Sequence, residues 1–284
     1  MKRVNSVPQV AAINDLSGFG RCSLTVSIPI LSSMGYQVCP MPTALLSAHT
    51  GYEGAQMWDF TANMQAYLAH WEQLGLDFKA VFTGYLGGAA QVEYLLPFVR
   101  EQKQRGALCL VDPAMADHGE LYASCTPALV REMRRLVSLA DVTTPNVTEA
   151  CLLTDTVYTD VVAPDGTANC KCLHTVGESL LALGCAAAVV TGVHGAPDRV
   201  ENWIFRHGQE PLVISAARVA KNYAGTGDVF SSVLCGELLR GAALPQAVEK
   251  TAAFVQRVTD YTAKEDTPLQ DGIIFEPFLA LLNE

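Results

Sequence analysis

The sequence predicts an α/β fold: a three-layer α/β/α sandwich built on a mostly parallel central sheet. Short apolar runs recur along the chain, and longer amphipathic stretches separate them, which is the pattern of repeated βαβ units. The runs are nearly continuous in apolar and β-branched residues, as expected for strands covered on both faces. Half of the 284 residues are hydrophobic, so we expect residues 1–284 to form a single domain around a large core.

The apolar runs are interpreted as strands. Six of them form the expected parallel sheet: Gln9–Asn14, Gln37–Pro42, Lys79–Thr83, Ala107–Val111, Asp141–Thr144 and Ala186–Thr191. Asn202–Phe205 and Leu212–Ser215 are separated by Arg206-His207-Gly208-Gln209, and they predict a hairpin.

The amphipathic stretches are interpreted as helices. Met57–Leu74 carries apolar residues at helical spacing, in one stripe that is explained by core packing. Further helices are expected at Gln91–Gln104, Thr126–Leu139, Gly177–Leu183, Gly227–Arg240 and Pro245–Tyr261. The segment Asp155–Asn169 contains Pro164-Asp165-Gly166 and is expected to be a loop.

Charge and composition exclude several classes of function. The net charge is −10 and no basic cluster is present, which argues against nucleic acid and anionic membranes as main partners. No apolar run reaches the roughly 18 residues of a membrane span. The apolar stretch near the N-terminus is broken by Pro8 and Asn14, so no signal peptide is expected.

The cysteines indicate a reducing compartment. There are nine, an odd number, and most lie in apolar segments, so we expect reduced thiols and a cytoplasmic protein. The cluster Cys170-Lys171-Cys172-Leu173-His174 offers three zinc ligands without C-x₂-C spacing. An irregular loop that enters a helix explains this cluster better than a zinc site does.

The first glycine-rich motif, Gly18-Phe19-Gly20-Arg21-Cys22-Ser23, follows the first strand. It lacks the third glycine of a dinucleotide-binding motif, and no acidic residue follows at the end of the second strand, so we reject a Rossmann oxidoreductase. The motif is interpreted as a turn that brings Asn14 and Asp15 to the strand end, where they contact a polar substrate. A purely structural turn remains the alternative.

The second motif, Ala224-Gly225-Thr226-Gly227-Asp228, precedes a helix. Free backbone N–H groups and the positive end of the helix dipole can hold the negative charge that grows on a transferring phosphoryl group. A carboxylate at Asp228 can accept a proton from an attacking hydroxyl, and near its usual pKa it is ionised at pH 7. The alternative is that Asp228 caps the helix, but glycines on both sides of Thr226 leave room for a ligand.

Two acidic motifs follow other strands. In Thr144-Pro145-Asn146-Val147-Thr148-Glu149, Asn146 and Glu149 share a helix face, so that Glu149 can hold Mg²⁺ directly or through water. A capping box with Asn146 as the cap explains the same spacing. Asp112 and Asp117 lie at another strand end and can contribute to a cation site, although turn chemistry is an equal explanation. His118 beside them is interpreted as a surface residue.

In this order, the motifs resemble the ribokinase-like superfamily and, within it, the pyridoxal kinases, which act on vitamin B6. The resemblance covers nearly the whole chain. The stretches that carry it are Ser47-Ala48-His49-Thr50-Gly51-Tyr52, Thr83-Gly84-Tyr85-Leu86-Gly87, Asp112-Pro113 with Asp117, Thr144-Pro145-Asn146 with Glu149, and Gly225-Thr226-Gly227-Asp228. The last is shared by the superfamily, whereas the first two are more specific to B6 kinases.

The resemblance implies an ATP-dependent transferase that phosphorylates the 5′-hydroxymethyl group of pyridoxal, pyridoxine or pyridoxamine, in the salvage of vitamin B6 to pyridoxal 5′-phosphate. It implies Asp228 as catalytic base, Gly225-Thr226-Gly227 as anion hole, and Asp112 and Glu149 as residues at a Mg²⁺ ion. The implied nucleotide-binding residues are Asn146, Thr191 and Gly192, and the residues implied around the pyridine ring are Asn14, His49, Thr50 and Tyr85. It also implies a homodimer and a monovalent cation such as K⁺ near the nucleotide.

Three departures from the B6 kinases concern the ring pocket. Asn14 stands where serine is common, Leu46 where an aromatic residue is common, and Ala48 where asparagine is common. They bear on the substrate more than on the reaction, so a hydroxymethylpyrimidine kinase of the same superfamily is an alternative. A non-catalytic protein that binds a B6 vitamer or a nucleoside is another, against which Asp228 argues because binding alone needs no base.

Overall fold

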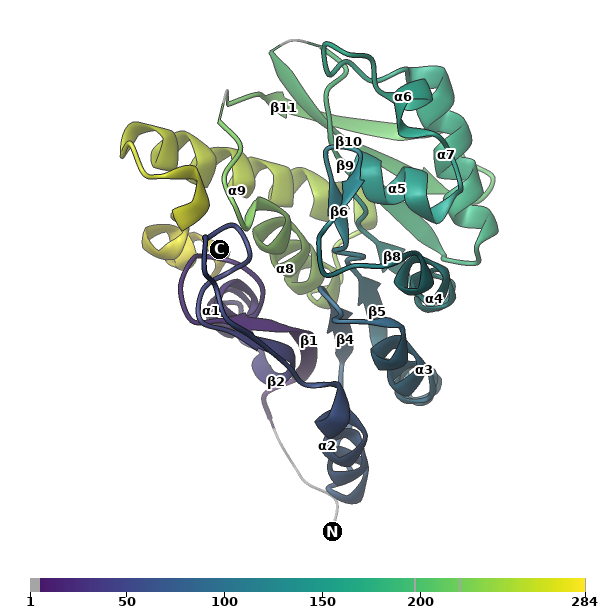
Figure 1. Ribbon diagram of the computed structural model, residues 1–284, viewed down its shortest axis with the longest axis vertical. Coiled ribbons are helices and arrows are strands. Elements are labelled where there is room, and N and C mark those ends of the chain that lie inside the picture. Colours follow the sequence, from purple (N-terminus) through teal and green to yellow (C-terminus); the bar gives the residue numbers. More distant parts are fainter. Residues whose placement is uncertain (1–5, 197, 220, 284) are drawn as a thin grey trace.

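The computed structural model describes residues 6–196, 198–219 and 221–283, and its centre is a nine-stranded sheet (Figure 1). The strand order is β11-β10-β9-β8-β5-β4-β1-β2-β3. The inner strands run parallel: β1 (Gln9–Ser17), β2 (Gln37–Leu46), β4 (Ala80–Thr83), β5 (Leu108–Val111), β8 (Val142–Thr143) and β9 (Ala187–Val193). Each coincides with a predicted strand, and the predicted fold class is confirmed.

Antiparallel strands form both edges of the sheet. β10 (Arg199–Arg206) and β11 (Leu212–Ala217) form the predicted hairpin beyond β9, and β3 (Met57–Asp59) pairs with β2. A separate two-stranded ribbon consists of β6 (Ala116–Asp117) and β7 (Glu120–Leu121).

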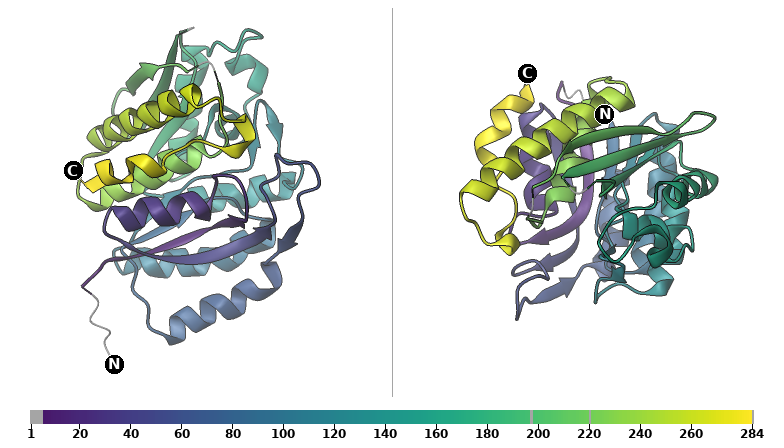
Figure 2. Two further views of the ribbon diagram at one scale, coloured as in Figure 1. Left: turned by 90° about the vertical axis from the view of Figure 1, so that its left-hand side faces the viewer. Right: turned by 90° about the horizontal axis from the view of Figure 1, so that it is seen from above.

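Helices cover both faces of the sheet (Figures 1 and 2). One face carries α1 (Leu24–Ser33), α8 (Thr226–Leu239), α9 (Leu244–Lys264) and the 3₁₀ helix η2 (Glu276–Asn283). The other face carries α2 (Thr61–Gln73), α3 (Ala89–Gln104), α4 (Pro127–Val137), α5 (Val147–Leu153), α6 (Tyr158–Val161) and α7 (Cys170–Ala182). A short 3₁₀ turn, η1 (Leu269–Asp271), precedes η2. Each face buries its own apolar cluster, so the sheet is covered twice as expected.

Three local expectations were wrong. Met57–Asp59 is an exposed edge strand, because its backbone pairs with Ala44–Leu46, and the helix begins only at Thr61. α7 begins at Cys170, before the expected Gly177, because the Asn169 side chain accepts hydrogen bonds from the N–H groups of Lys171 and Cys172 in the first turn of the helix. The predicted loop Asp155–Asn169 contains the short helix α6.

Helix α1 was not predicted. It contains Pro29, which has no backbone N–H and usually argues against a helix interior. The buried side chains of Val26, Ile30 and Leu31 belong to the cluster between the sheet and α8–α9, so tertiary packing outweighs the cost of the proline.

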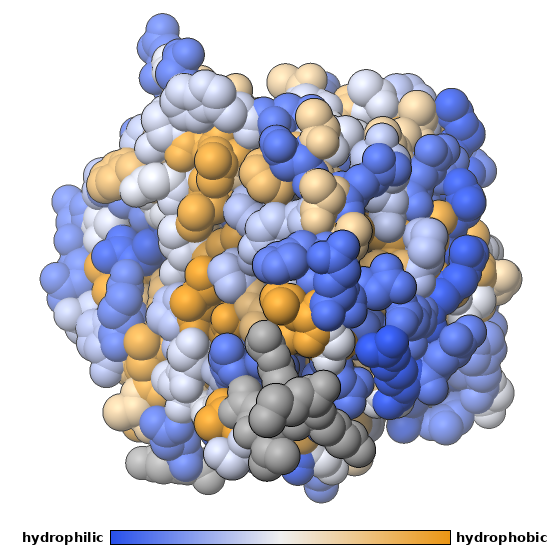
Figure 3. Space-filling model, turned by 90° about the horizontal axis from the view of Figure 1, so that it is seen from below, coloured by the Kyte–Doolittle hydropathy of each residue, from blue (hydrophilic) through white to orange (hydrophobic). Residues whose placement is uncertain are grey.

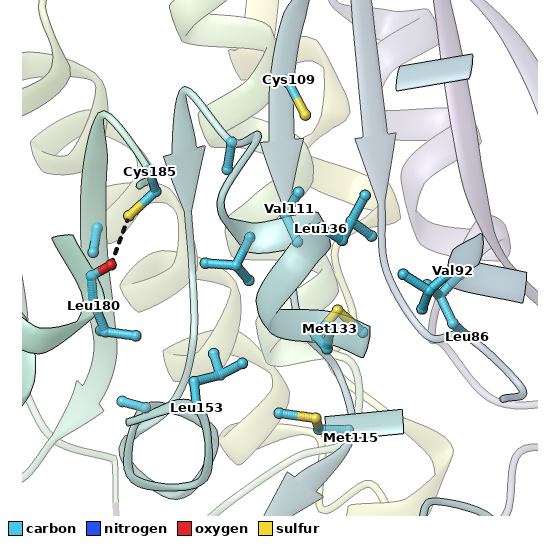
Figure 4. Close-up of a cluster of buried hydrophobic side chains, with 14 of the residues drawn as sticks. Leu86, Val92, Cys109, Val111, Met115, Met133, Leu136, Leu153, Leu180 and Cys185 are labelled. Carbon is cyan, nitrogen blue, oxygen red and sulfur yellow. Dashed lines mark hydrogen bonds between the residues drawn. The ribbon is translucent and has the colours of Figure 1, made fainter. Parts of the chain in front are cut away.

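The apolar cluster on the α2–α7 face anchors the carboxyl end of β5 (Figure 4). Val111 and Met115 are fully buried in it, together with Met133 and Leu136 of α4. Asp112 lies between these two anchored residues. The core therefore holds the backbone of an acidic strand end in place.

The surface is mixed in character. The face seen in Figure 3 has hydrophobic residues interspersed among hydrophilic ones. Within the described part of the chain, no helix is both long and apolar enough to cross a membrane.

Candidate active site

The site forms where the sheet changes its direction of growth. From β1 the chain crosses to β2 on one side and later returns to β4 on the other, so a crevice opens outside the carboxyl ends of β1 and β4. Asn14 lies at this point and is 2% exposed. Its Oδ1 accepts hydrogen bonds from the backbone N–H groups of Asp15 (2.9 Å) and Tyr85 (2.8 Å), which fixes the orientation of the side-chain amide.

The amide of Asn14 links the sheet to α8. Its Nδ2 donates to Oδ1 of Asp228 at 3.3 Å. The close approach requires a glycine at position 84, because a Cβ there would lie 2.2 Å from Asn14 Nδ2. The Thr-Gly-Tyr motif after β4 is therefore explained in part by the space that Asn14 occupies.

The two glycines of the α8 motif serve different purposes. Gly225 has φ +74°, and a Cβ on it would lie 1.9 Å from the carbonyl oxygen of Arg21, so the fold itself requires glycine. A Cβ on Gly227 would meet no atom within 4 Å. The fold does not require this second glycine, and the space in front of it is open to a ligand.

The backbone N–H groups of Thr226, Gly227 and Asp228 donate to no acceptor among the described residues, because the first bond of the helix runs from Val229 N–H to the Gly225 carbonyl. The Thr226 hydroxyl donates to the Tyr223 carbonyl (2.8 Å). The beginning of α8 thus presents free donors and a dipole to an anion.

Asp228 is partly buried beside these donors. The pKa of its carboxyl is raised to about 7: burial is the largest cause and the negative charge of Asp15 adds to it, whereas hydrogen bonds from the Ser23 backbone and the Asn14 amide oppose the rise. The sequence suggested an ordinary pKa for Asp228, whereas the structure gives it a pKa close to neutrality. A carboxylate of this kind is better matched to proton transfer near pH 7.

Asp112 is held by a chain of hydroxyl groups. Ser231 of α8 donates to its Oδ2 at 2.6 Å, and Thr144 lies 2.9 Å from the Ser231 hydroxyl. Burial raises the pKa of Asp112, and the charge of Asp228 adds to this. Within the part of the chain that the structure describes, its Oδ1 accepts no hydrogen bond and is free to bind a cation.

Asn146 and Glu149 form the capping box that the spacing allowed. Glu149 N–H donates to Asn146 Oδ1 (2.9 Å), and Glu149 Oε2 accepts from Asn146 N–H (2.8 Å). Glu149 Oε1 accepts from Met115 N–H (3.2 Å), and the residue is 3% exposed. Burial and the nearby charge of Asp112 raise the pKa of Glu149.

These two carboxyl groups fit a divalent cation. They are oxygen donors, as Mg²⁺ prefers, and they repel each other in a buried setting, which a bound cation would relieve. Asp112 offers a direct ligand through Oδ1. Glu149 has both oxygens engaged by backbone N–H groups, so its contact with a hydrated ion through water suits the structure better.

A cavity of about 600 Å³ unites most of the predicted site. It is lined by the implied catalytic, metal and nucleotide residues: Asp112, Asn146, Glu149, Thr191, Gly192 and Gly225 to Asp228. Asn146 and Thr191 are paired by a β-bridge, and Gly192 has φ +67° with no atom within 4 Å of a Cβ position. His118 is exposed, as expected, and it also lines the cavity.

The residues implied around the substrate ring lie outside this cavity. Asn14 is linked to it by the hydrogen bond to Asp228, Tyr85 packs against the apolar cluster, and Thr50 is exposed. His49 donates through Nε2 to the Gln270 carbonyl (2.5 Å), if Nδ1 is the acceptor for Gly51 N–H (3.1 Å). With both ring nitrogens engaged, His49 acts as a tether of its loop in this conformation.

A segment near the C-terminus, Leu269–Ile273, binds the loops around Asp228. Ala224 N–H donates to the Leu269 carbonyl, and Ile273 N–H donates to the Ala224 carbonyl, each at 3.1 Å. Arg21 N–H donates to the Asp271 carbonyl (3.2 Å). Ala224, which precedes Gly225, is therefore held by this segment through both its N–H and its carbonyl group.

A comparison with known protein families assigns the chain. The phosphomethylpyrimidine kinase family matches residues 39–269, which is most of the chain. The chain belongs to this family. As a member it is a kinase of the ribokinase-like superfamily, which confirms the resemblance read from the motifs.

Individual relatives extend this result. The chain is 30% identical over 268 residues to the pyridoxine/pyridoxal/pyridoxamine kinase of Bordetella pertussis strain Tohama I, with 89% of each chain covered. It is 28% identical over 243 residues to the hydroxymethylpyrimidine/phosphomethylpyrimidine kinase of Escherichia coli K12, with 82% of each covered. A candidate phosphomethylpyrimidine kinase from Bacteroides thetaiotaomicron VPI-5482, crystallised with pyridoxal, superimposes with TM-score 0.90 at 36% identity, over 98% of this chain and 96% of that one.

Two polar residues have roles at the site that the sequence did not predict: Asp15, which was expected only to contact a polar substrate, and Ser231. Asp15, 6% exposed, accepts hydrogen bonds from Ser17 (3.0 Å) and Ser23 (2.5 Å) and lies close enough to Asp228 to raise its pKa. Ser231 positions Asp112. The Asn-Asp pair at the end of the first strand was a usable signal for Asp15, whereas Ser231 lies one helical turn beyond Asp228 and gave none.

Proposed function

We propose that the protein is an ATP-dependent kinase that phosphorylates the 5′-hydroxymethyl group of pyridoxal, pyridoxine or pyridoxamine. The observation that carries the proposal is the position of Asp228. Its carboxyl accepts a hydrogen bond from the Asn14 amide at the sheet crevice, and the residue itself stands in the first turn of α8, where the N–H groups are free. A base and an anion-binding group thus meet at one point on the cavity wall, as transfer of a phosphoryl group to an alcohol requires.

In the proposed reaction, Asp228 accepts the proton of the substrate hydroxyl as its oxygen forms a bond to the γ-phosphorus of ATP. The bond between that phosphorus and the β–γ bridging oxygen breaks, and ADP leaves. The N–H groups of Thr226 and Gly227 stabilise the charge on the transferring phosphoryl group. The Asn14 amide holds the Asp228 carboxylate in place throughout.

Asp112 and Glu149 are proposed to hold Mg²⁺, with Asn146, Thr191 and Gly192 beside the nucleotide phosphates. The ion would neutralise phosphate charge. The proposal is supported by the shared cavity and by the raised pKa values of both carboxyl groups.

The B6 vitamers are favoured as substrates by two findings. The Bordetella relative acts on them, and a relative that is 36% identical was crystallised with pyridoxal. A hydroxymethylpyrimidine kinase is the second candidate, which the family assignment and the Escherichia coli relative favour.

A direct comparison of alcohols tests the proposal. Purified protein is incubated with ATP, Mg²⁺ and pyridoxal, pyridoxine, pyridoxamine or hydroxymethylpyrimidine in turn, and the products are identified by mass. We expect a 5′-phosphorylated vitamer with the highest kcat/KM. A preference for the pyrimidine would support the second candidate, and binding without transfer in single-turnover experiments would indicate a non-catalytic binding protein.

The proposal extends to the setting of the enzyme. We propose a cytoplasmic homodimer, assisted by a monovalent cation such as K⁺ near the nucleotide. The nine cysteines, all of them within the described residues, are unpaired, which suits a reducing compartment. Light scattering of the purified protein and activity with K⁺ replaced by a bulky organic cation test the other two statements.

A further inference from the structure

Asn202 is a buried polar residue on a strand of the sheet edge, and nothing in the proposed mechanism uses it. It is 6% exposed and stands in the centre of β10, opposite Ile214 of β11. Trp203 and Phe205 of the same strand pack into the cluster on the α2–α7 face, and Ile204 packs into the cluster on the α8–α9 face. Since side chains alternate along a strand, Asn202 shares the α8–α9 face with Ile204.

The side-chain amide of Asn202 makes no hydrogen bond to any residue in the ranges 6–196, 198–219 and 221–283. A carboxamide carries two donor hydrogens and an acceptor oxygen, and buried polar groups of this kind are normally paired. The neighbouring Trp203 shows the usual outcome, because its indole N–H donates to Glu201 at 2.9 Å. Asn202 therefore has hydrogen-bonding capacity left for a ligand.

The surroundings of Asn202 form one end of the large cavity. Val200 and Ala216, which pair across the hairpin, line it from the sheet, and Ala252 and Val255 line it from α9. Figure 2 shows α9 running beside the hairpin. This end is a slot between a strand pair and a helix, with these four aliphatic side chains and the Asn202 carboxamide in its walls, and Gln256 and Thr259 of α9 line the cavity as well.

The other end of the same cavity holds the free N–H groups of α8 and the acidic pair. A nucleotide has the matching polarity, with phosphates at one end and a flat ring with a polar edge at the other. The aliphatic side chains of the slot can pack against the flat ring. Asn202 can bind the polar edge of that ring, because its carboxamide offers one donor and one acceptor side by side.

We propose that Asn202 hydrogen-bonds the edge of the adenine ring of the nucleotide and so contributes to the choice of phosphate donor. Its Nδ2 donates to a ring nitrogen, N1 or N7, while its Oδ1 accepts from the exocyclic 6-amino group, the bidentate arrangement by which asparagine reads adenine. This inference rests on the proposed function, in which ATP is the donor.

A cycle that combines a mutation with a change of ligand tests the contact. Wild type and Asn202→Ala are titrated calorimetrically with ADP and with purine riboside 5′-diphosphate, which lacks the 6-amino group. We expect Asn202→Ala to lower the affinity for ADP roughly 5- to 150-fold, as for loss of a buried hydrogen-bond partner. Wild type should bind the purine analogue less tightly than ADP. The mutation should reduce the affinity for the analogue much less than it reduces the affinity for ADP.

A matched variant controls for damage to the hairpin. Gln209→Ala removes the same functional group from the exposed turn between β10 and β11, and it should leave both dissociation constants unchanged. Asn202→Asp, which keeps the shape but offers only acceptors, provides a second variant. It should weaken binding of the purine analogue at least as much as binding of ADP, because both ligands lose the donor to the ring nitrogen and only ADP keeps its 6-amino group bonded to a carboxylate oxygen.

The outcomes are separable from those of the activity assay. The proposed contact would be overturned if Asn202→Ala reduced the affinities for ADP and for the purine analogue equally. It would also be overturned if wild type bound the two ligands with equal affinity. If the protein phosphorylates a vitamer with ATP while the mutation and the loss of the 6-amino group show no coupling, only this inference fails. If no phosphate transfer occurs but the mutation and the loss of the 6-amino group are coupled, the contact between Asn202 and adenine stands and the proposed function fails.

Discussion

The carboxyl group of Asp228 accepts a hydrogen bond from the amide of Asn14 across 3.3 Å, although 214 positions separate the two residues in the sequence. Asn14 is itself fixed by two backbone N–H groups from β1 and from the loop after β4. The position of the proposed base is therefore set by the centre of the sheet and not by α8 alone.

Asp228→Asn should abolish turnover and leave nucleotide and substrate affinity within a few-fold. The amide keeps the shape and the contact region of the carboxyl but cannot accept a proton. Loss of a general base costs roughly 10²–10⁴ in rate. Steady-state kinetics and calorimetric titration measure the two effects, and a near-normal kcat would remove Asp228 from the mechanism.

The pH dependence of wild type should report the same group. Because burial raises the pKa of Asp228 to about 7, the base is protonated below that pH, and kcat/KM should fall on the acidic side with a midpoint near 7. Replacement of Asn14 by alanine removes a hydrogen bond that favours the ionised form, so the midpoint should move to higher pH. An acidic limb near pH 4 would contradict this assignment.

The two glycines of the α8 motif should respond oppositely to alanine. Gly227→Ala adds a methyl group to open space, so thermal stability should be nearly unchanged while turnover falls, because the methyl group occupies the region in front of the N–H groups. Gly225→Ala forces a Cβ to 1.9 Å from the Arg21 carbonyl at φ +74°, so it should destabilise the fold. Full activity of Gly227→Ala would exclude the proposed anion site.

Asp112→Asn should stabilise the metal-free protein at pH 8 and leave its stability unchanged at pH 3. Burial raises the folded-state pKa of Asp112 above 3.8, so the folded state binds a proton more tightly than the unfolded state. Stability is then lost as the pH rises between 3.8 and the raised value, a loss that asparagine cannot undergo. Thermal unfolding with a chelator measures this, and saturating Mg²⁺ should stabilise wild type more than the variant.

Glu149→Gln should raise the Mg²⁺ concentration needed for half-maximal rate. It also weakens the capping box of α5, so a loss of stability is expected in addition. Thr126→Ala is a matched control, because Thr126 caps α4 by accepting from Leu129 N–H and lies outside the cavity lining. If Glu149→Gln behaves like this control, with lower stability and the same Mg²⁺ response, Glu149 is a cap and not a metal residue.

Thr50→Val should reduce the preference for pyridoxine over hydroxymethylpyrimidine. Thr50 offers a hydroxyl for the phenolic oxygen of a B6 ring, which a pyrimidine lacks, and an unpaired buried group costs roughly 5- to 150-fold in preference. The exposed position of Thr50 and the tethered His49 beside it indicate the low end of that range. Equal effects on both substrates would show that this loop does not read the ring.

The sequence predicts those parts of the site that follow directly from strand ends. Asp112, Asn146, Thr191 and the α8 motif each come at a predicted strand or helix terminus, and the parallel sheet brings such termini to one edge. The strands themselves were predictable because each is a short, continuous apolar run.

The remaining features depend on contacts between distant segments. The His49 tether ends on a backbone carbonyl at Gln270, and backbone carbonyls carry no sequence signal. Asn202 lies within an expected strand, where alternation alone does not reveal which face meets a cavity. Helix α1 was not predicted, because Pro29 has a low helix propensity and the tertiary packing that favours the helix is not visible in the sequence.

The hydrogen bonds from Leu269–Ile273 to Ala224 have a consequence for biosynthesis. During translation, β1, β4 and α8 emerge long before residue 269 leaves the ribosome. The loop before Gly225 can make its two backbone hydrogen bonds only after that point, so the proposed catalytic centre cannot be completed until nearly the whole polypeptide has been made. A chain that stops short of residue 269 would contain every strand of the described sheet and helix α8, and it would still lack both backbone partners of Ala224.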